Sequence, residues 1–500
     1  MKLMKAKNFT AVILVISFLA MFISCANDTG NGSGDVNNEN ATNTDTEIDN
    51  SIDGELEVDA AENLNDDLGE FDFEGYEFNM LTRNVDFFNC RLDFEEMTGE
   101  VLEDTIYERN RRIEERFNVV IKEINTYDLS RARNAINAGD NAYDMIMTRN
   151  PDAFTVFAQE NLIAGFDTLT HVNLDKPYWD DYVTAELSIS NKKYFAVGAF
   201  NLSAYDFVHV LMFNKKLIAD YGLANPYELV KNGTWTYDTF EEISKSATLD
   251  LNGDGAMDKN DAYGFLSSPK QVLPGFWISA GLKSIAKDEN DIPYSTMATE
   301  KFFEVFDRIY TMTWDNQIWF NTSTGANVDT ELLNMFQHDQ ALFMDCTFFY
   351  LASLRNMESD FGILPYPKYN EQQEKYYSRM EGCDLFFVPI SAPQENLDRT
   401  SVILEALSSD SAKFLVPVYY DLALKTKFTR DDESAEIIDI LFENRVFDLG
   451  DTSWCDKVRD PIFAEMFKRN NRDLASKLES LEKTVTTLIE KTVTAFEQLD

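Results

Sequence analysis

The hydrophobic pattern of the chain alternates between short apolar runs and amphipathic stretches from about residue 71 onward. Apolar runs that predict strands cover residues 76–81, 118–124 and 143–147, and a stretch with charges at three- and four-residue spacings lies at 106–117. Strands that alternate with helices are joined by right-handed crossovers into a mainly parallel sheet. The pattern therefore predicts an α/β fold, whose ligands bind at the carboxyl ends of the strands.

Polar residues stand at these predicted strand ends. Arg83 and Asn84 follow the first strand, and Arg149 follows the third. They are candidates for ligand contacts because the carboxyl ends of parallel strands share one edge of the sheet. The alternative for each of them is an ordinary polar loop residue.

The first 25 residues have the organisation of an export signal. Three lysines precede an apolar run at 9–23, which is short for a membrane-spanning helix but suits a secretory signal. The run ends at Cys25 and resembles the lipobox of bacterial lipoproteins, in which the cysteine is acylated, although Phe22 stands where leucine is usual. We expect Cys25 to anchor the protein by lipid on the extracytoplasmic face of a cell membrane. A plain signal peptide or an uncleaved anchor is the alternative.

Residues 26–70 predict a linker. They are rich in Asn, Asp, Glu, Thr, Gly and Ser and contain no Lys or Arg. Such a segment buries too little apolar surface to offset its ordering entropy, and its like charges repel one another. We expect an extended, disordered acidic linker that holds the folded part away from the membrane.

The charge of the whole chain restricts the possible partners. The 500 residues include 87 Asp and Glu against 44 Lys and Arg, a formal net charge of −43. This balance argues against nucleic acid as a partner, because neutralising phosphates requires a basic face. A hydrophobic content of 44% allows a substantial core, and the length suggests two or three domains.

The cysteines do not predict a metal centre. After Cys25 they are Cys90, Cys346, Cys383 and Cys455, at wide and irregular spacings. These spacings form neither a zinc ribbon nor a dense disulfide framework. One or two disulfides in an exported protein are the alternative, and the sequence does not assign their pairing.

The middle of the chain carries several motifs in a characteristic order. An apolar run at 207–213 leads into FNKKL, and the letters GTWT at 233–236 end in Thr236, which is positioned to cap a helix. Later come FGILPYPK at 361–368 and an apolar run at 383–389. In this order the motifs resemble those of the family 1 extracellular solute-binding proteins, the receptors of ABC importers, typically for carbohydrates.

The resemblance implies a fold and a function. The fold is the two-lobed α/β fold of periplasmic binding proteins (type II), with a ligand cleft between lobes joined by crossing strands. Lobe I would comprise residues 71–205 and about 380–445, and lobe II residues 206–379 and about 446–500, with a C-terminal docking helix. The function would be capture of a carbohydrate, which we expect to be an oligosaccharide, by a monomer that docks on the permease subunits of an ABC importer.

Signals for catalysis are weak. The chain has three histidines, none in an H-E-x-x-H motif, and no nucleotide-binding or nucleophile-elbow fingerprint. We therefore expect a binding protein and no enzyme. The alternatives are a glycoside hydrolase or lyase, a peptide receptor, and a glycan-capture lipoprotein without a transporter.

One loop at 250–261 predicts a structural calcium site. Its letters DLNGDGAMDKND place oxygen ligands at loop positions 1, 3, 5, 7, 9 and 12, with glycine at position 6 for the tight turn. The candidate ligands are Asp250, Asn252, Asp254, the carbonyl of Ala256, Asp258 and Asp261. The alternative is a loop built of Asx turns that binds no metal.

A sugar site needs an aromatic platform surrounded by polar groups. We expect Trp277 to form the platform, because glycine and small residues surround it in PGFWISAG, and Trp319 and Trp179 come next. An interior core position is the alternative for Trp277. The expected rim residues are Arg83, Asn84, Arg149, Asp206, Asp345 and Glu381.

Overall fold

The computed structural model describes residues 63–85, 88–320, 328–354, 356–425 and 432–498. The chain divides into two units, Met1–Asp67 and Leu68–Asp500, and the described helices and strands lie in the second. Cys25 and most of the predicted linker lie outside the described residues. Within the described ranges, each helix is too short or too polar to cross a lipid bilayer.

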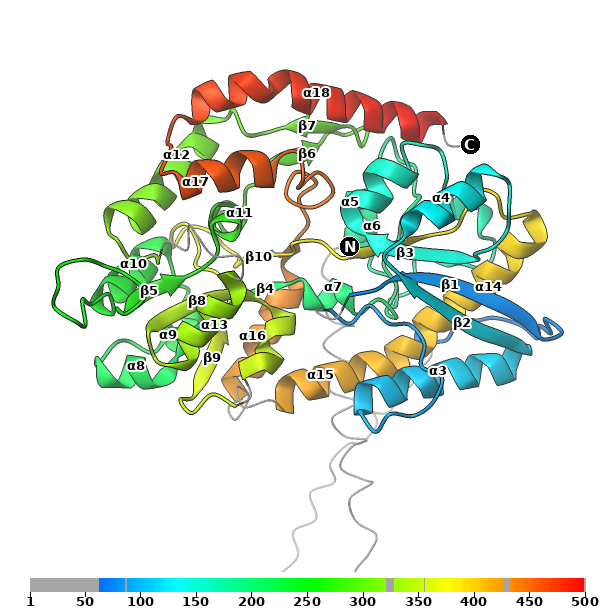
Figure 1. Cartoon of the computed structure of the whole chain (residues 1–500), viewed down its shortest axis with the longest axis horizontal. Helices are drawn as coiled ribbons and strands as arrows, with labels where there is room; N and C mark the ends of the chain where they lie inside the picture. The colour runs from blue at the N-terminus through cyan, green and yellow to red at the C-terminus, as the bar shows by residue number, and fades with distance from the viewer. Residues whose placement is uncertain (1–62, 86–87, 321–327, 355, 426–431, 499–500) are drawn as a thin grey trace, which may run out of the picture. The chain divides into compact units, whose positions relative to one another are not determined.

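The first sheet has the predicted parallel arrangement and belongs to the part of the molecule that we call lobe I (Figure 1). Its strands are β1 (Tyr76–Arg83), β2 (Val119–Thr126), β3 (Met145–Arg149) and β11 (Asp384–Phe387), in the order β11-β3-β1-β2. β1 pairs in parallel with β2 and β3, whereas β11 returns from late in the chain and pairs antiparallel with β3. The three strands predicted from the N-terminal half are confirmed.

Helices cover this sheet because each buries one apolar stripe. α3 (Val101–Phe117) buries Ile106, Ile113 and Phe117, which lie on one helix face, and ends at Asn118 in the left-handed conformation, with φ 48°. The other helices of lobe I are α4 (Leu129–Asn137), α5 (Asn150–Asp152), α6 (Asp181–Leu187), α7 (Ser203–Asp206), α14 (Gln394–Asp410) and α15 (Val416–Lys425).

The second sheet forms the core of lobe II. Its strands are β4 (His209–Asn214), β5 (Tyr263–Leu266), β8 (Ala341–Thr347) and β9 (Phe361–Leu364), in the order β5-β8-β4-β9. β4 is antiparallel to both of its neighbours, and β5 is parallel to β8. The sheet is thus mixed.

Helices and a short hairpin complete lobe II. The helices are α8 (Lys215–Asp220), α9 (Pro226–Lys231), α10 (Tyr237–Ser246), α11 (Pro269–Ser279), α12 (Glu300–Tyr310), α13 (Val328–Gln337), α16 (Asp432–Glu443) and α17 (Glu465–Lys468), and the hairpin strands are β6 (Ile285–Lys287) and β7 (Pro293–Ser295). The Thr236 side chain accepts the backbone N–H of Thr239 at the start of α10, which confirms the predicted cap.

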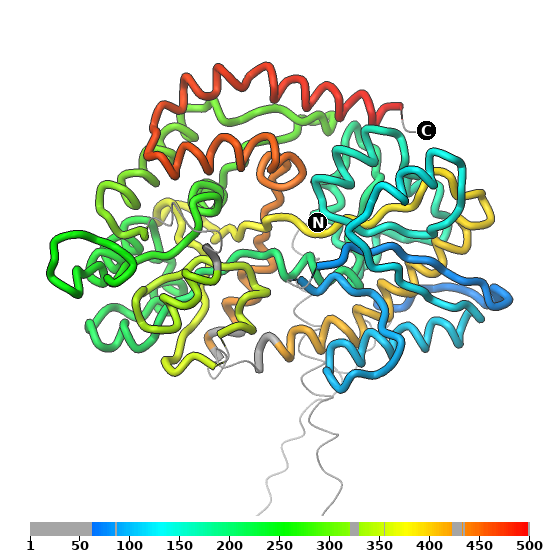
Figure 2. The backbone as a smooth tube through the Cα atoms, viewed as in Figure 1, coloured from blue at the N-terminus to red at the C-terminus, as the bar shows by residue number. Residues whose placement is uncertain are grey.

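Two stretches of the described chain connect the lobes, and their path can be followed in Figure 2. One leads through Val208 into β4, and the other contains β10 (Ser378–Arg379). A further strand, β12 (Arg445–Val446), belongs to the stretch that joins α16 to α17. β10 pairs in parallel with β12, and Val208 forms a bridge with Met380. These pairings hold the crossing segments side by side, as the two-lobed fold requires.

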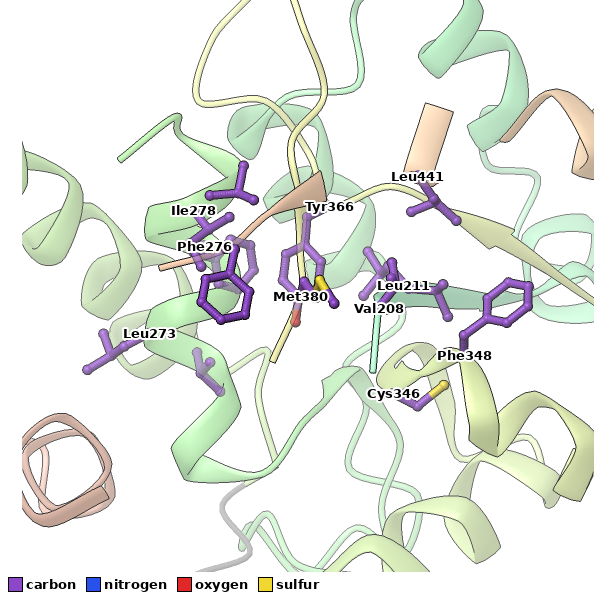
Figure 3. Packing of buried hydrophobic residues seen from close by; sticks show 14 of the residues in the cluster. Val208, Leu211, Leu273, Phe276, Ile278, Cys346, Phe348, Tyr366, Met380 and Leu441 are labelled. Carbon is purple, nitrogen blue, oxygen red and sulfur yellow. The ribbon is translucent and has the colours of Figure 1, made fainter. Parts of the chain in front are cut away.

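The core continues across these connections. Figure 3 shows Val208 and Leu211 of the β4 segment near Met380 and Tyr366, with Phe276 of α11 on the other side of Tyr366. All five residues are at most 1% exposed. The crossing segments are therefore anchored by hydrophobic burial as well as by backbone hydrogen bonds.

One apolar run of lobe I forms no strand. The residues from Tyr194 to Gly198 are buried but make only isolated bridges. The carbonyl of Lys193 accepts from Phe166, and the carbonyl of Val197 accepts from Asp180. The two ends of the run thus bond to different segments, so no continuous ladder forms.

The C-terminal helix α18 (Leu474–Gln498) contacts both lobes. It packs against β7 of lobe II, while the ring of Phe496 lies 5.3 Å from those of Phe154 and Tyr194 in lobe I. The helix therefore packs through its apolar residues against lobe II at one end and against lobe I at the other.

Candidate functional site

A cavity of about 430 Å³ lies between the lobes. Its walls include the ends of β1 and β3 and the start of β11 from lobe I, and β4, β8 and the first turn of α11 from lobe II. The connecting residues Glu381 to Cys383 form part of its lining. A volume of this size falls within the usual range for small-molecule sites.

The lobe I wall carries both predicted strand-end arginines. Arg83 binds Asp384 with two hydrogen bonds, Nε to Oδ2 at 3.0 Å and Nη2 to Oδ1 at 2.7 Å. Arg149 Nη2 lies 2.5 Å from Asp456 Oδ2. Both arginines line the cavity, and their paired carboxylates line it as well.

The lobe II wall contains Asp345, a predicted rim residue at the end of β8. His209 Nδ1 lies 2.8 Å from Asp345 Oδ1, and the Ser267 hydroxyl donates to Oδ2 at 2.8 Å. Both carboxylate oxygens thus have partners within the protein. His209, which the sequence analysis did not single out, also lines the cavity.

Glu381 lies in the connecting segment at the back of the cavity. Its Oε1 accepts from Arg459 at 3.0 Å and its Oε2 accepts from Gln271 at 3.0 Å. Burial raises the pKa of Glu381, but the charges of Arg459, Lys270 and Arg379 outweigh burial and hold the pKa well below its ordinary value. The side chain is therefore ionised at neutral pH.

A second layer of charge lies behind Glu381. Arg379 and Asp451 are both fully buried and form two hydrogen bonds, Nε to Oδ2 at 2.7 Å and Nη2 to Oδ1 at 2.9 Å. Arg459 Nη1 lies 3.5 Å from Asp451 Oδ1. Together with Glu381 and His209 these residues form what we call the rear network.

Two predicted rim residues do not line the cavity. Asp206 is completely buried and accepts the backbone N–H of Asn89 and the Tyr419 hydroxyl, both at 2.7 Å. Burial raises the pKa of Asp206 to about 6, because its partners are neutral donors. Asn84 is exposed, and its backbone N–H donates to the Thr126 carbonyl at 3.3 Å.

The three tryptophans expected as a platform occupy core positions instead. Trp277 is 2% exposed, and its ring packs 4.9 Å from that of Phe463. The space expected beside Gly275 is filled, because a Cβ there would lie 2.7 Å from the ring of Tyr366. The other two indoles bond internally, Trp319 to the Ser267 carbonyl at 2.8 Å and Trp179 to Glu405 Oε2 at 2.9 Å.

Three other aromatic residues line the cavity. They are Phe88, Phe207 and Tyr350, all half-buried. The rings of Phe88 and Phe207 are stacked with centroids 3.8 Å apart and planes at 24°. Two of them could have been identified from their positions next to strands. Phe207 precedes the β4 segment, and Tyr350 follows β8.

The cavity wall also holds buried polar groups without partners. Within the described part of the chain, the hydroxyls of Ser268 and Thr347 and both amide atoms of Asn150 have no hydrogen-bond partner. Buried polar atoms are rarely left unsatisfied, so such groups indicate a place where water or a ligand completes the hydrogen bonding.

The loop at 250–261 consists of tight turns. Asp250 accepts the backbone N–H groups of Gly253 and Gly255, at 2.7 and 2.9 Å, and both glycines have positive φ, at 73° and 80°. Asp261 is buried and accepts two further backbone N–H groups of the loop. Asn252, Asp254, Ala256 and Asp258 are exposed, so their oxygens are accessible to an ion.

A group of side chains with the spacing of metal ligands lies outside the 250–261 loop. Among the described residues, ligand atoms of one group of three, Cys455, Asp456 and Asp460, lie within 4.8 Å of one another, whereas those of the 250–261 loop do not meet this spacing. Asp456 and Asp460 already pair with Arg149 and Arg459. The four cysteines of the described residues are buried, and no disulfide forms among them.

Comparison with known proteins identifies the fold. Neither a family model nor a curated protein matches the chain. Solved structures do match over most of its length. A cyclo/maltodextrin-binding protein in complex with maltotetraose is 10% identical, with 86% of this chain and 98% of that chain covered and a TM-score of 0.55.

Two further structures are similar to the same extent. A sugar transporter protein of Rhizobium etli in an open conformation is 12% identical, covering 85% of this chain and 100% of its own, with a TM-score of 0.55. A family 1 extracellular solute-binding protein of Bifidobacterium longum subsp. infantis is 14% identical, covering 82% and 99%, with a TM-score of 0.53. The predicted two-lobed fold is thereby confirmed.

Proposed function

We propose that this protein with the solute-binding fold captures a carbohydrate in the cavity between its lobes and delivers it to the permease of an ABC importer. It acts on the extracytoplasmic side of the membrane, anchored through a lipid on Cys25, and it catalyses no reaction. The solved relatives that bind maltotetraose or are described as sugar transporters support a sugar as the ligand.

The observation that carries the proposal is the composition of the cavity wall. Phe88, Phe207 and Tyr350 offer apolar ring surface, and a sugar presents a complementary C–H face. The unsatisfied groups of Asn150 and Thr347 are suited to the hydroxyls around a sugar ring. Aromatic surface with a few convergent polar groups is the usual construction of a small-molecule site.

The charge state of Glu381 favours binding over glycoside hydrolysis. A hydrolase needs one carboxylic acid that is protonated near neutral pH and one carboxylate. The pKa of Glu381 is held far below its ordinary value by neighbouring cations. Glu381 is therefore a poor proton donor. As a permanent anion it keeps the side chains of Arg459 and Gln271 in place, which is a role in binding and not in catalysis.

The test is a screen of the full-length protein by thermal shift and titration calorimetry with neutral and acidic oligosaccharides and with peptides. We expect a sugar to raise the melting temperature, and chromatography to find no cleavage product. Tyr350→Ala should weaken sugar binding roughly tenfold or more, by loss of ring contact. Phe414→Ala is the matched control, because Phe414 is an aromatic residue that is 48% exposed and does not line the cavity.

Two results would contradict the proposal. Stabilisation by peptides alone would replace the sugar by another ligand class. Appearance of shortened sugars would establish the hydrolase or lyase alternative.

The lipid anchor is tested separately. Cys25→Ser should release the protein from the membrane fraction or block processing of the signal, because the acylated side chain is lost. Unchanged partitioning and processing would leave a plain signal peptide or an uncleaved anchor.

We also infer that the 250–261 loop binds one structural Ca²⁺ ion, since oxygen atoms in this order suit a hard cation. Binding to the folded state alone stabilises it, so a chelator should lower the melting temperature and Ca²⁺ should restore it. Asp250→Ala should abolish this response, whereas Glu371→Ala, at an exposed acidic residue elsewhere, should retain it. A melting curve insensitive to chelator would leave the loop as a set of Asx turns.

A further inference from the structure

The charged groups of the cavity wall are unequally paired. Each lining carboxylate is held by a basic side chain of the protein. The pairs are Asp345 with His209, Glu381 with Arg459, Asp384 with Arg83, Asp456 with Arg149 and Asp460 with Arg459. The carboxylates are thus already engaged, and none of them is left over to receive a cationic ligand.

Lys270 is different from the other lining cations. Its ammonium group forms no ion pair or hydrogen bond with any described residue, although the side chain lines the cavity. Its charge contributes to lowering the pKa of Glu381, which places it in the electrostatic environment of the cavity without a direct contact. One positive charge at the wall is therefore available to a ligand.

The N-terminus of α11 adds to this charge. Lys270 is the second residue of this 11-residue helix, and the preceding Ser268 occupies the N-cap position without accepting a cap hydrogen bond. Ser268 lines the cavity, is 6% exposed and has a hydroxyl without a partner among the described residues. The first turn of a helix carries partial positive charge and attracts anions.

We propose that the cavity recognises an acidic carbohydrate, whose single negatively charged group binds between the Ser268 hydroxyl, the Lys270 ammonium and the first turn of α11. This inference rests on the proposed function and specifies the substrate class of the same site. The anionic group is the carboxylate of a uronic acid or a sulfate ester, which share this chemistry. Asn150 and Thr347 remain for the neutral hydroxyls.

The net charge of the protein does not oppose such a ligand at short range. The formal charge of −43 includes the acidic segment before residue 71 and acts over long distances. At physiological ionic strength exposed charges are screened over about 8 Å. A contact with Lys270 inside the cavity is shorter than this, so the ammonium group acts on a bound anion directly.

Titration calorimetry on the full-length protein tests the inference with matched probes. These are trigalacturonate, its fully methyl-esterified form, maltotriose, and maltotriose carrying one sulfate ester. We expect an acidic probe to bind at least about tenfold more tightly than its uncharged counterpart, because hydrogen bonds to charged groups are the stronger ones. The acidic probe with the larger gain in affinity, trigalacturonate or sulfated maltotriose, shows whether the anionic group of the ligand is a carboxylate or a sulfate ester.

Three variants locate the effect. Lys270→Met should remove the preference, so that the acidic probe and its uncharged counterpart bind with similar affinity, whereas Lys270→Arg should retain most of the preference. Lys375→Met makes the same charge change at an exposed lysine outside the cavity and should have no effect. Because Lys270 is exposed, these variants should fold, and their melting temperatures check this.

The possible outcomes separate the two proposals. Binding of neutral sugars without preference for acidic ones, or a preference that survives in Lys270→Met, overturns the acidic-ligand inference and leaves the sugar-binding function standing. Failure of all sugars, acidic and neutral, in this titration and in the wider screen overturns the proposed function and the inference with it.

Discussion

The back of the cavity and its side walls differ in how far the protein satisfies its own polar groups. In the rear network, Arg379 and Asp451 bind each other through two hydrogen bonds, and Glu381 has partners on both oxygens. On the walls, Asn150 and Ser268 are buried without partners among the described residues. The rear network is a completed framework that fixes the crossing segments, whereas the walls are complete only when something else is bound.

The largest expected effect comes from breaking the rear network. Arg379→Met should lower the free energy of unfolding by about 3–5 kcal/mol, because the buried Asp451 carboxylate loses both hydrogen bonds from Arg379 and keeps only Arg459 at 3.5 Å. Urea denaturation measures this loss. The control is Arg112→Met, which removes a bidentate pair with Asp410 at the surface and should cost about 1 kcal/mol or less. Equal losses in the two variants would remove the distinction between framework and surface pairs.

The next largest effect is on the pH dependence of stability, to which two buried carboxylates contribute in opposite directions. Asp206 has neutral donors, and burial raises its pKa to about 6, whereas Glu381 has cationic neighbours and a lowered pKa. A raised carboxyl pKa means that the folded state binds more protons than the unfolded state between about pH 4 and 6, so stability falls as pH rises through this window. For Asp206 this amounts to on the order of 3 kcal/mol.

Asp206→Asn should therefore flatten the pH dependence of stability between pH 4 and 7, relative to the natural protein. Denaturation at several pH values measures the slope, and the absolute stability of the variant is not needed. The lowered pKa of Glu381 acts in the opposite sense and at lower pH, so Glu381→Gln should not flatten this window. An unchanged slope in Asp206→Asn would show that Asp206 is not the group whose raised pKa produces the pH dependence.

The smallest expected effect on folding comes from the walls. Asn150→Ala should leave the melting temperature nearly unchanged, since no hydrogen bond to a described residue is lost, but should weaken sugar binding about tenfold. Calorimetry and thermal melting report the two quantities in parallel. Asn137→Ala, at an exposed position of α4, serves as the control. A large loss of stability with unchanged affinity would assign Asn150 to the framework.

Local pattern was sufficient for much of the fold. The strands β1, β2 and β3 and the Thr236 cap follow from alternation, apolar runs and capping chemistry within a few residues. Arg83 and Arg149 line the cavity because position at a carboxyl strand end is itself a local property. These predictions needed no knowledge of distant segments.

The remainder depended on contacts between distant parts of the chain. The space beside Gly275 was expected to be open, but Tyr366, about ninety residues later, fills it and confines Trp277 to the core. Asp206 was expected at the rim, but its side chain is buried against Asn89 and Tyr419, and Phe207, the next residue, lines the cavity. Neighbouring residues can face different surroundings, and sequence position alone does not say which.

Helix α18 has a consequence for the energetics of ligand capture. Because it packs on β7 at one end and buries Phe496 against lobe I at the other, any change in the angle between the lobes has to shift or release one of these contacts. The helix thus contributes to the free-energy difference between arrangements of the lobes. Apparent affinity scales with the population of the binding-competent arrangement, so residues far from the sugar set part of the measured dissociation constant.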